Sequence, residues 1–328
     1  MARVLVTGGS GFVGRALIEV LLGQGHRVWC VSRSRPIVDS PSESLGWIQS
    51  DLGNGRAYAD AIARVDCIFH LASLLTARRR SEYISVNVEG TRALFDTCHR
   101  AGQHIRRFVY MSSIAAMGPT DNGSLLTEST SCRPRTQYGA SKLAAEHIVR
   151  ENASEFPAVI LRPSFIYGPR DSRGAVFLRD LFGTRPSASR LTIRDMSFCH
   201  VSDVVRACLC ALECENPDGR VYLVAEPKSY GWHDVDEILE RSLSELSVSC
   251  EPSEAELARH LLDRVRAMSE SAEEIEGEHW GCDTRRAARE LEFEACRFLD
   301  EAASEVIESY LRNGLLNAPD NVGVGTEV

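Results

Sequence analysis

Short apolar runs alternate with helix-like segments over the first half of the chain. The apolar runs, each of a length typical of a buried strand, cover residues 3–7, 26–32, 65–73, 106–113 and 157–164. The segments that repeat apolar positions at helical spacing cover residues 15–22, 82–101 and 138–151. Strands that alternate with helices predict right-handed βαβ units and a parallel sheet covered by helices on both faces.

The pattern changes after about residue 165. A loop at 168–190, rich in Arg, Ser and Gly, is followed by a short strand-like run at 191–193, a helix from Ser202 and a strand at 220–226. One or two acidic amphipathic helices are predicted over residues 253–276, and a last helix over 298–311. This C-terminal part alternates too little to be a second βαβ sheet.

The predicted fold is α/β, a Rossmann-type doubly wound parallel sheet with a smaller C-terminal substrate-binding cap. Residues 1–165, with parts of 198–226, are assigned to the dinucleotide-binding domain. The cap is assigned to residues 166–197 and 227–312. Residues 313–328 lack periodicity and are expected to form a disordered tail.

Charge and composition exclude several classes of partner. The net charge of -9 over 328 residues argues against a nucleic-acid binder, which needs a basic face. No secretory signal precedes the first strand, and no apolar stretch approaches the ~20 residues of a membrane span. We therefore expect a cytoplasmic protein with no membrane partner. Its 11 cysteines form no CxxC pair of the kind that binds zinc, so we expect reduced thiols and no metal site.

Three glycines, Gly8, Gly11 and Gly14, follow the first strand. Their spacing is GxxGxxG rather than GxGxxG, but a dinucleotide fingerprint has the same position between a strand and a helix. A helix N-terminus offers free N–H groups and a positive dipole end to a pyrophosphate. The alternative is a tight turn that binds no ligand.

The end of the second strand favours one form of the cofactor. An NAD enzyme places Asp or Glu there for the ribose 2′-hydroxyl, whereas an NADP enzyme prefers Arg near the 2′-phosphate. This chain has Ser32-Arg33-Ser34-Arg35 and no carboxylate. Because Arg pairs bidentately with phosphate, NADP(H) is favoured, with NAD(H) as the alternative. Two exposed arginines without a ligand would give the same pattern.

Tyr138 and Lys142 are four residues apart on a predicted helix, so they share one face. A lysine ammonium beside a phenol stabilises the phenolate, which makes Tyr138 a candidate general acid or base. Ser112 and Ser113 end the strand 106–113, where a hydroxyl could donate to a substrate oxygen. A single YxxxK pair is common by chance, so this prediction depends on its context.

Taken together, these motifs resemble the extended short-chain dehydrogenase/reductase superfamily, in its NAD-dependent epimerase/dehydratase form. The resemblance covers roughly residues 3–312. Its matching stretches are VTGGSGFVG, SDL at 50–52, FHLAS at 69–73, NVEGT at 87–91, FVYMSS, YGASK, LRPSFIYGPRD at 161–171, SFCHVSDVV at 197–205 and CDTRRAAREL.

The resemblance implies a role for each matching residue. The implied catalytic residues are Ser113, with Ser112 as the alternative, Tyr138 and Lys142. The implied cofactor-binding residues are Gly8, Gly11, Phe12, Val13, Gly14, Ser32, Arg33, Asp51, Leu52, Leu71, Ala72, Asn87, Tyr138, Lys142, Pro163 and Ser164. The resemblance also implies a homodimer through helices 82–101 and 138–151.

Two departures from the family pattern bear on the reaction. Sugar-nucleotide dehydratases carry Thr-Asp-Glu where this chain has residues 113–115, Ser-Ile-Ala, so no acid is present for water elimination. Nucleotide-sugar epimerases place an Arg where this chain has Met196, and Arg194 lies two residues away. The resemblance is therefore closer to the dihydroflavonol reductase and 3-beta-hydroxysteroid dehydrogenase-like branch, which tends to insert helices like those at 253–276.

The predicted function is hydride transfer between NADP(H) and the carbonyl or secondary alcohol of a small-molecule substrate, with Tyr138 as general acid or base. A sugar or nucleotide-sugar epimerase with tightly held NAD is the first alternative. A non-catalytic protein that senses NADP(H) is the second. Such proteins usually lose the tyrosine or the lysine, and both are present here.

Overall fold

A seven-stranded parallel sheet forms the centre of the molecule. The computed structural model describes residues 1–36, 42–101, 104–172, 174–175, 178, 192–269 and 277–316. The strands, in sheet order, are β3 (Leu45–Gln49), β2 (Arg27–Ser32), β1 (Arg3–Thr7), β4 (Cys67–His70), β5 (Arg107–Met111), β6 (Ala158–Pro163) and β9 (Arg220–Val224). Each neighbouring pair is parallel. This is the doubly wound Rossmann order with one strand added beside β6, so the predicted fold class is confirmed.

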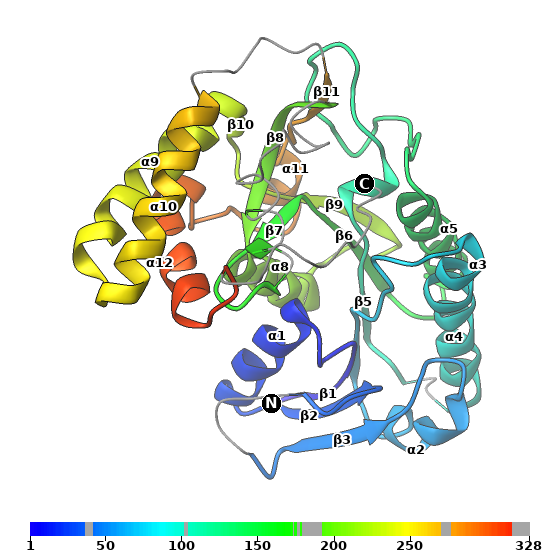
Figure 1. Cartoon of the computed structure of the whole chain (residues 1–328). Helices are drawn as coiled ribbons and strands as arrows, with labels where there is room; N and C mark the ends of the chain where they lie inside the picture. Colours follow the sequence, from blue (N-terminus) through cyan, green and yellow to red (C-terminus); the bar gives the residue numbers. More distant parts are fainter. Residues whose placement is uncertain are drawn as a thin grey trace.

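Helices cover both faces of this sheet (Figure 1). One face packs under α1 (Phe12–Gly23) and α8 (Val201–Glu213), and the other under α4 (Gly90–Ala101) and α5 (Gln137–Glu151). The strand residues alternate between the two cores. In β5, Val109 and Met111 belong to the first core, whereas Phe108 and Tyr110 belong to the second. Burial on both faces explains why these strands appear in the sequence as continuous apolar runs.

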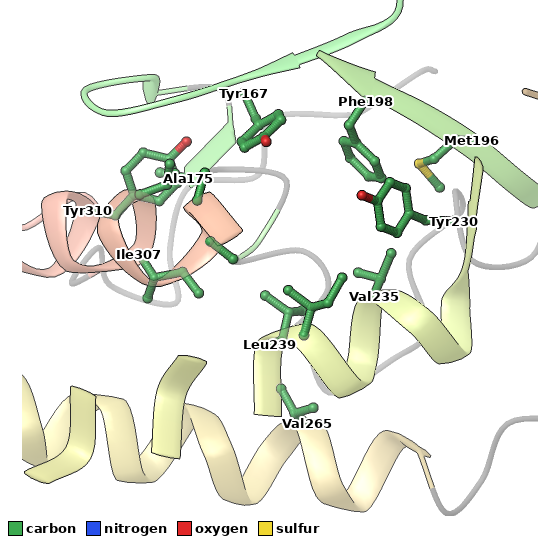
Figure 2. Close-up of a cluster of buried hydrophobic side chains, with 14 of the residues drawn as sticks. Tyr167, Ala175, Met196, Phe198, Tyr230, Val235, Leu239, Val265, Ile307 and Tyr310 are labelled. Atoms are coloured by element: carbon green, nitrogen blue, oxygen red, sulfur yellow. The ribbon is translucent and has the colours of Figure 1, made fainter. Parts of the chain in front are cut away.

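The C-terminal part forms a second layer, which we call the cap. Its strands are β7 (Phe165–Tyr167), β8 (Ile193–His200), β10 (Ser229–Gly231) and β11 (Glu278–Trp280). Its helices are α9 (Trp232–Ser249), α10 (Pro252–Ser269) and α12 (Leu299–Arg312). β8 pairs with all three other strands, and α9 packs against both α10 and α12. Figure 2 shows the buried apolar side chains that these elements share.

Several elements differ from the sequence prediction. The pattern predicts no element at 232–249, where α9 lies, although its buried positions recur at helical spacing. The strand predicted at 191–193 is the eight-residue β8, and β3 was not predicted. The predicted helix 82–101 is interrupted by a π-helical turn, η2 (Ile84–Glu89), between α3 (Arg80–Tyr83) and α4.

The predicted tail begins inside the described part of the chain. Residues 313–316 form a turn, and Leu316 packs into the cap core with 6% of its surface exposed. Residues 317–328 lie outside the described residues, as does most of the predicted loop 168–190. Within the described ranges, no helix has the length and apolar character needed to cross a bilayer.

Two glycines of the first loop are required by backbone packing. Gly8 has φ +73°, a conformation that favours glycine, and a Cβ there would lie 2.6 Å from the amide nitrogen of Ala72. A Cβ on Gly14 would lie 2.3 Å from the carbonyl oxygen of Gly8. The turn between β1 and α1 therefore depends on close approach between backbone segments.

We predict that Gly14→Ala lowers the free energy of unfolding by about 1–3 kcal/mol, because the added methyl group meets backbone that cannot move aside. Gly23→Ala is the matched control at the end of the same helix, since a Cβ there has no neighbour within 4 Å. The control should gain about 0.5–1 kcal/mol from helix propensity. Urea unfolding of both variants measures the difference, and equal stabilities would contradict the packing argument.

Candidate active site

One large cavity brings the predicted site residues together. It has a volume of about 2170 Å³ and extends from the glycine loop into the cap. Every predicted catalytic and cofactor-binding residue lines it except Asn87, which lies beneath the wall. Pockets for one drug-sized ligand measure roughly 300–1,000 Å³, so this cavity has room for a dinucleotide and a second ligand.

The glycine loop fits a bound pyrophosphate. Gly11 is the N-cap of α1 and lines the cavity. A Cβ on Gly11 would meet only the carbonyl oxygen of Gly8, at 3.2 Å, so protein packing explains this glycine less well than it explains Gly14. Close approach of a ligand to the backbone explains it better. The first turn of α1 carries no acidic residue, so the positive end of the helix dipole is available to an anion.

Ser164 gives a second indication of a ligand. It follows β6, lines the cavity and is only 6% exposed. Its buried hydroxyl oxygen has no hydrogen-bond partner among the described residues. Buried side-chain polar atoms in proteins nearly always have a partner. A polar ligand group, such as the carboxamide that the predicted nicotinamide site would receive, could supply it.

A buried histidine, His70, joins the ends of β1 and β4 near the glycine loop. Thr91 Oγ1 donates to the carbonyl oxygen of Asn87, so it accepts from His70 Nε2, at 2.9 Å. His70 Nδ1 then accepts from Thr7 Oγ1, at 2.7 Å, and Thr7 Oγ1 accepts from the Ala72 amide. Burial, with a smaller effect of Lys142, lowers the pKa of His70 to about 3. The imidazole is therefore neutral and holds the loop after β4 in place.

Asn87 supports the wall from below rather than facing the cavity. Its Nδ2 donates to the Leu74 carbonyl oxygen at 3.0 Å and to Ser141 Oγ at 2.8 Å. Its Oδ1 accepts from the Leu74 amide at 2.7 Å. The side chain thus ties the loop after β4 to α5, the helix that carries Tyr138.

Lys142 ties α5 to the end of β5. Its Nζ donates to the Met111 carbonyl oxygen at 2.5 Å and lies 4.4 Å from the centre of the Tyr110 ring. The side chain lines the cavity but is 1% exposed. Burial lowers the pKa of Lys142 to about 7, and the nearby Glu146 opposes that shift. A lysine that titrates near neutrality at a cavity wall is typical of a functional site.

The two serines after β5 have different surroundings. Ser112 is buried, and its hydroxyl donates to Glu146 Oε1 at 2.5 Å. Ser113 Oγ accepts from the Ala115 amide at 3.1 Å, so its own proton can be donated elsewhere. Both residues line the cavity, but only Ser113 is partly exposed to it. The geometry thus favours Ser113 over the alternative, Ser112, as the residue that meets a substrate oxygen.

A buried ion pair behind Ser112 was not predicted from the sequence. Arg162 donates from Nε to Glu146 Oε1 at 2.8 Å and from Nη2 to Oε2 at 2.6 Å. The side chains of Arg162 and Glu146 are 1% and 0% exposed. The one available signal was an arginine inside a strand that is otherwise apolar, LRPS at 161–164.

The end of β2 presents a positive charge to the cavity. Ser32 Oγ donates to the Ser34 carbonyl oxygen at 2.6 Å and accepts from Trp47 Nε1 at 3.1 Å. Arg33 is exposed and lines the cavity, and its guanidinium has no partner within the described ranges. Arg35 is also exposed, but it does not line the cavity.

The position where epimerases carry a phosphate-binding arginine is apolar here. Met196 is 0% exposed and belongs to the cap core (Figure 2). Arg194 is exposed on β8 and does not line the cavity. Neither residue therefore presents a cation to the cavity.

Comparison with known proteins identifies the family. Residues 4–225 match the sequence profile of the NAD dependent epimerase/dehydratase family. A 4-hydroxy-2-methyl-3-oxo-4-farnesyl-3,4-dihydroquinoline-1-oxide ketoreductase of Stigmatella aurantiaca is 32% identical over 237 residues, 68% of either chain. A 3-beta-hydroxysteroid dehydrogenase of Mycolicibacterium neoaurum is 38% identical over 187 residues, 52% of this chain and 49% of that protein. The chain thus spans about half to two thirds of these relatives.

Solved structures agree with this assignment. The structure of MoeE5 in complex with UDP-glucuronic acid and NAD is 26% identical, with a TM-score of 0.72 over 95% of this chain and 99% of that one. The structure of gox2253 is 25% identical, with a TM-score of 0.74 over 96% and 100%. The chain belongs to the NAD-dependent epimerase/dehydratase family, an extended branch of the short-chain dehydrogenases/reductases.

We predict that Glu146→Ala lowers the free energy of unfolding by about 3–5 kcal/mol, because it leaves the buried charge of Arg162 without a partner. Arg150→Ala is the control. Arg150 Nη2 also lies 3.8 Å from Glu146 Oε2, but the Arg150 side chain is 44% exposed. Arg150→Ala should therefore lower the free energy of unfolding by less than about 1 kcal/mol. Urea unfolding measures both variants. A Glu146→Ala variant as stable as the control would show that the buried pair is unimportant.

Proposed function

We propose that this protein is an oxidoreductase that transfers a hydride between a nicotinamide cofactor and a ketone or secondary alcohol. The main support for this proposal is the position of Ser113, Tyr138 and Lys142. All three line one cavity, between the glycine loop and the cap, and that cavity can hold two ligands.

The cofactor, when bound, supplies or accepts the hydride. In the direction of reduction, Ser113 Oγ–H donates a hydrogen bond to the substrate oxygen and holds the carbonyl in place. Tyr138 gives its phenolic proton to that oxygen as the alcohol forms. The Lys142 ammonium stabilises the phenolate that remains. Oxidation of the alcohol follows the same steps in reverse.

Two observations favour this reaction over epimerisation of a nucleotide sugar. Two of the relatives reported above are named as a dehydrogenase and a ketoreductase. Met196 is fully buried where an epimerase would need a cation for the nucleotide phosphates. Epimerisation with tightly held NAD remains the second candidate, because MoeE5 was solved with UDP-glucuronic acid and NAD.

The proposal is tested by following the oxidation of NADPH with simple ketones. Wild-type protein should show net oxidation that depends on the ketone, and Tyr138→Phe should lower the rate by about 10²–10⁴-fold because the proton donor is lost. Unchanged activity in Tyr138→Phe would contradict the role of this residue. An epimerase would return the hydride to its substrate and show no net oxidation.

We further propose that the cofactor is NADP(H), because Arg33, whose guanidinium has no partner among the described residues, lines the cavity just after β2, where the 2′-phosphate would lie. Arg33→Ala should weaken NADPH binding by about 10–100-fold, the value of a charge-assisted hydrogen bond, and leave NADH binding unchanged. Arg35→Ala is the matched control and should change neither. Calorimetric titration measures both affinities. Equal affinity of the wild-type protein for NADPH and NADH would overturn the preference.

The rate of ketone reduction should fall as the pH rises through about 7, since Lys142, with its pKa near that value, then loses its charge. Its stabilising effect on the Tyr138 phenolate is present below this pKa and is lost above it. Lys142→Met should be slow at every pH and should lack this alkaline limb. The profile of kcat/KM against pH measures the effect. A wild-type profile that stays flat through neutral pH would contradict it.

A further inference from the structure

The inner part of the cavity lies within the cap, and we call it the cap chamber. Its walls come from β7, β8, β11, α9 and α12. The apolar residues that line it include Phe165, Phe198, Val235, Leu239, Ala303 and Ile307. Figure 2 shows Val235 and Leu239 on α9, Ile307 and Tyr310 on α12, and Phe198 on β8 within the buried cluster that forms these walls.

The aromatic residues around the chamber turn their polar atoms into the protein. Tyr167 and Tyr230 both donate their hydroxyl protons to Glu226, at 3.1 and 2.7 Å. Tyr310 donates to the Gly168 carbonyl oxygen at 3.1 Å. Trp280 Nε1 donates to Glu278 Oε2 at 3.1 Å. The O–H and N–H donors of these side chains are therefore used within the protein.

The charges of the chamber disfavour an anion. Among the described residues, the ionisable carboxyl groups that line it belong to Asp171 and Glu278, and no lysine or arginine lines it. Of the arginines in the described ranges, those that line the cavity lie outside the cap, at Arg33, at residues 78–80 and at Arg135. A phosphate or carboxylate in the chamber would lose its hydration and meet charges of its own sign.

We propose that the substrate is a neutral molecule with a large apolar body, which fills the cap chamber while its carbonyl or hydroxyl group contacts Ser113 and Tyr138. The contact of the carbonyl or hydroxyl group with Ser113 and Tyr138 rests on the proposed function. Binding of the apolar body in the cap chamber does not depend on that function. Nucleotide sugars, sugar phosphates and keto acids are disfavoured. Ala303, the smallest side chain of the apolar wall, sets part of the width available to the ligand.

The experiment uses three ketones with the full chain: 2-decalone, which is neutral and bicyclic, cyclohexanone, which is smaller, and pyruvate, which is anionic. The expected order of kcat/KM is 2-decalone, then cyclohexanone, then pyruvate, with about tenfold or more between the first two because apolar pockets discriminate by added carbons. Calorimetric binding of 2-decalone to the NADPH-loaded protein is measured in parallel.

Two chamber variants and one control accompany these measurements. Val235→Asp should abolish binding of 2-decalone, whereas Val248→Asp, the same change at an 86% exposed position of α9, should leave it unchanged. Ala303→Phe introduces no charge and narrows the chamber. Ala303→Phe should lower kcat/KM for 2-decalone by about tenfold or more and change kcat/KM for cyclohexanone little. This variant provides the test if Val235→Asp fails to fold.

Binding of 2-decalone that Ala303→Phe weakens supports the chamber assignment. If such binding occurs without turnover of any ketone, the proposed function fails and the assignment stands. Preference for pyruvate over 2-decalone, or binding of 2-decalone that is the same in Ala303→Phe and wild type, overturns the assignment.

Discussion

The site depends on the way α5 docks against the end of β5. Lys142 Nζ bonds the Met111 carbonyl oxygen, and Ser112 Oγ bonds Glu146, so two buried contacts join the helix to this strand. The approach is so close that a Cβ on Gly139 would lie 2.0 Å from the Ala115 carbonyl oxygen. This contact fixes Tyr138 and Lys142, on the helix, relative to Ser113, just after the strand.

The cavity is surrounded by two kinds of groups: hydrogen-bonded polar groups in the Rossmann part and apolar side chains in the cap. The buried Arg162–Glu146 pair joins β6 to α5, and the neutral His70 joins the ends of β1 and β4, each through hydrogen bonds within the protein. Hydrogen bonds between buried polar groups favour the one arrangement that keeps them. The cap contributes shape and apolar surface instead. In the function proposed above, the Rossmann part performs the chemistry and the cap selects the substrate.

The sequence was sufficient for every strand of the sheet except β3, for the glycine loop and for placing Ser113 at the edge of the cavity, because parallel strands bring their carboxyl ends to one edge. Contacts between distant buried polar residues could not be predicted. His70 bonds partners 63 and 21 residues away, and a buried ion pair resembles surface charge in a sequence. The choice between Ser112 and Ser113 needed hydrogen-bond geometry, since both follow the same strand. α9 had a helical pattern, but only the fold shows that it encloses the chamber.

A double-mutant cycle on Ser113→Ala and Tyr138→Phe tests the central claim most directly, using kcat/KM for a ketone that the protein reduces. If α5 and the end of β5 hold both hydroxyls on one substrate oxygen, the two residues act as a unit. The double variant should then be little slower than the slower single variant. If the two losses add in free energy, the hydroxyls act independently, and the account of the catalytic centre is contradicted.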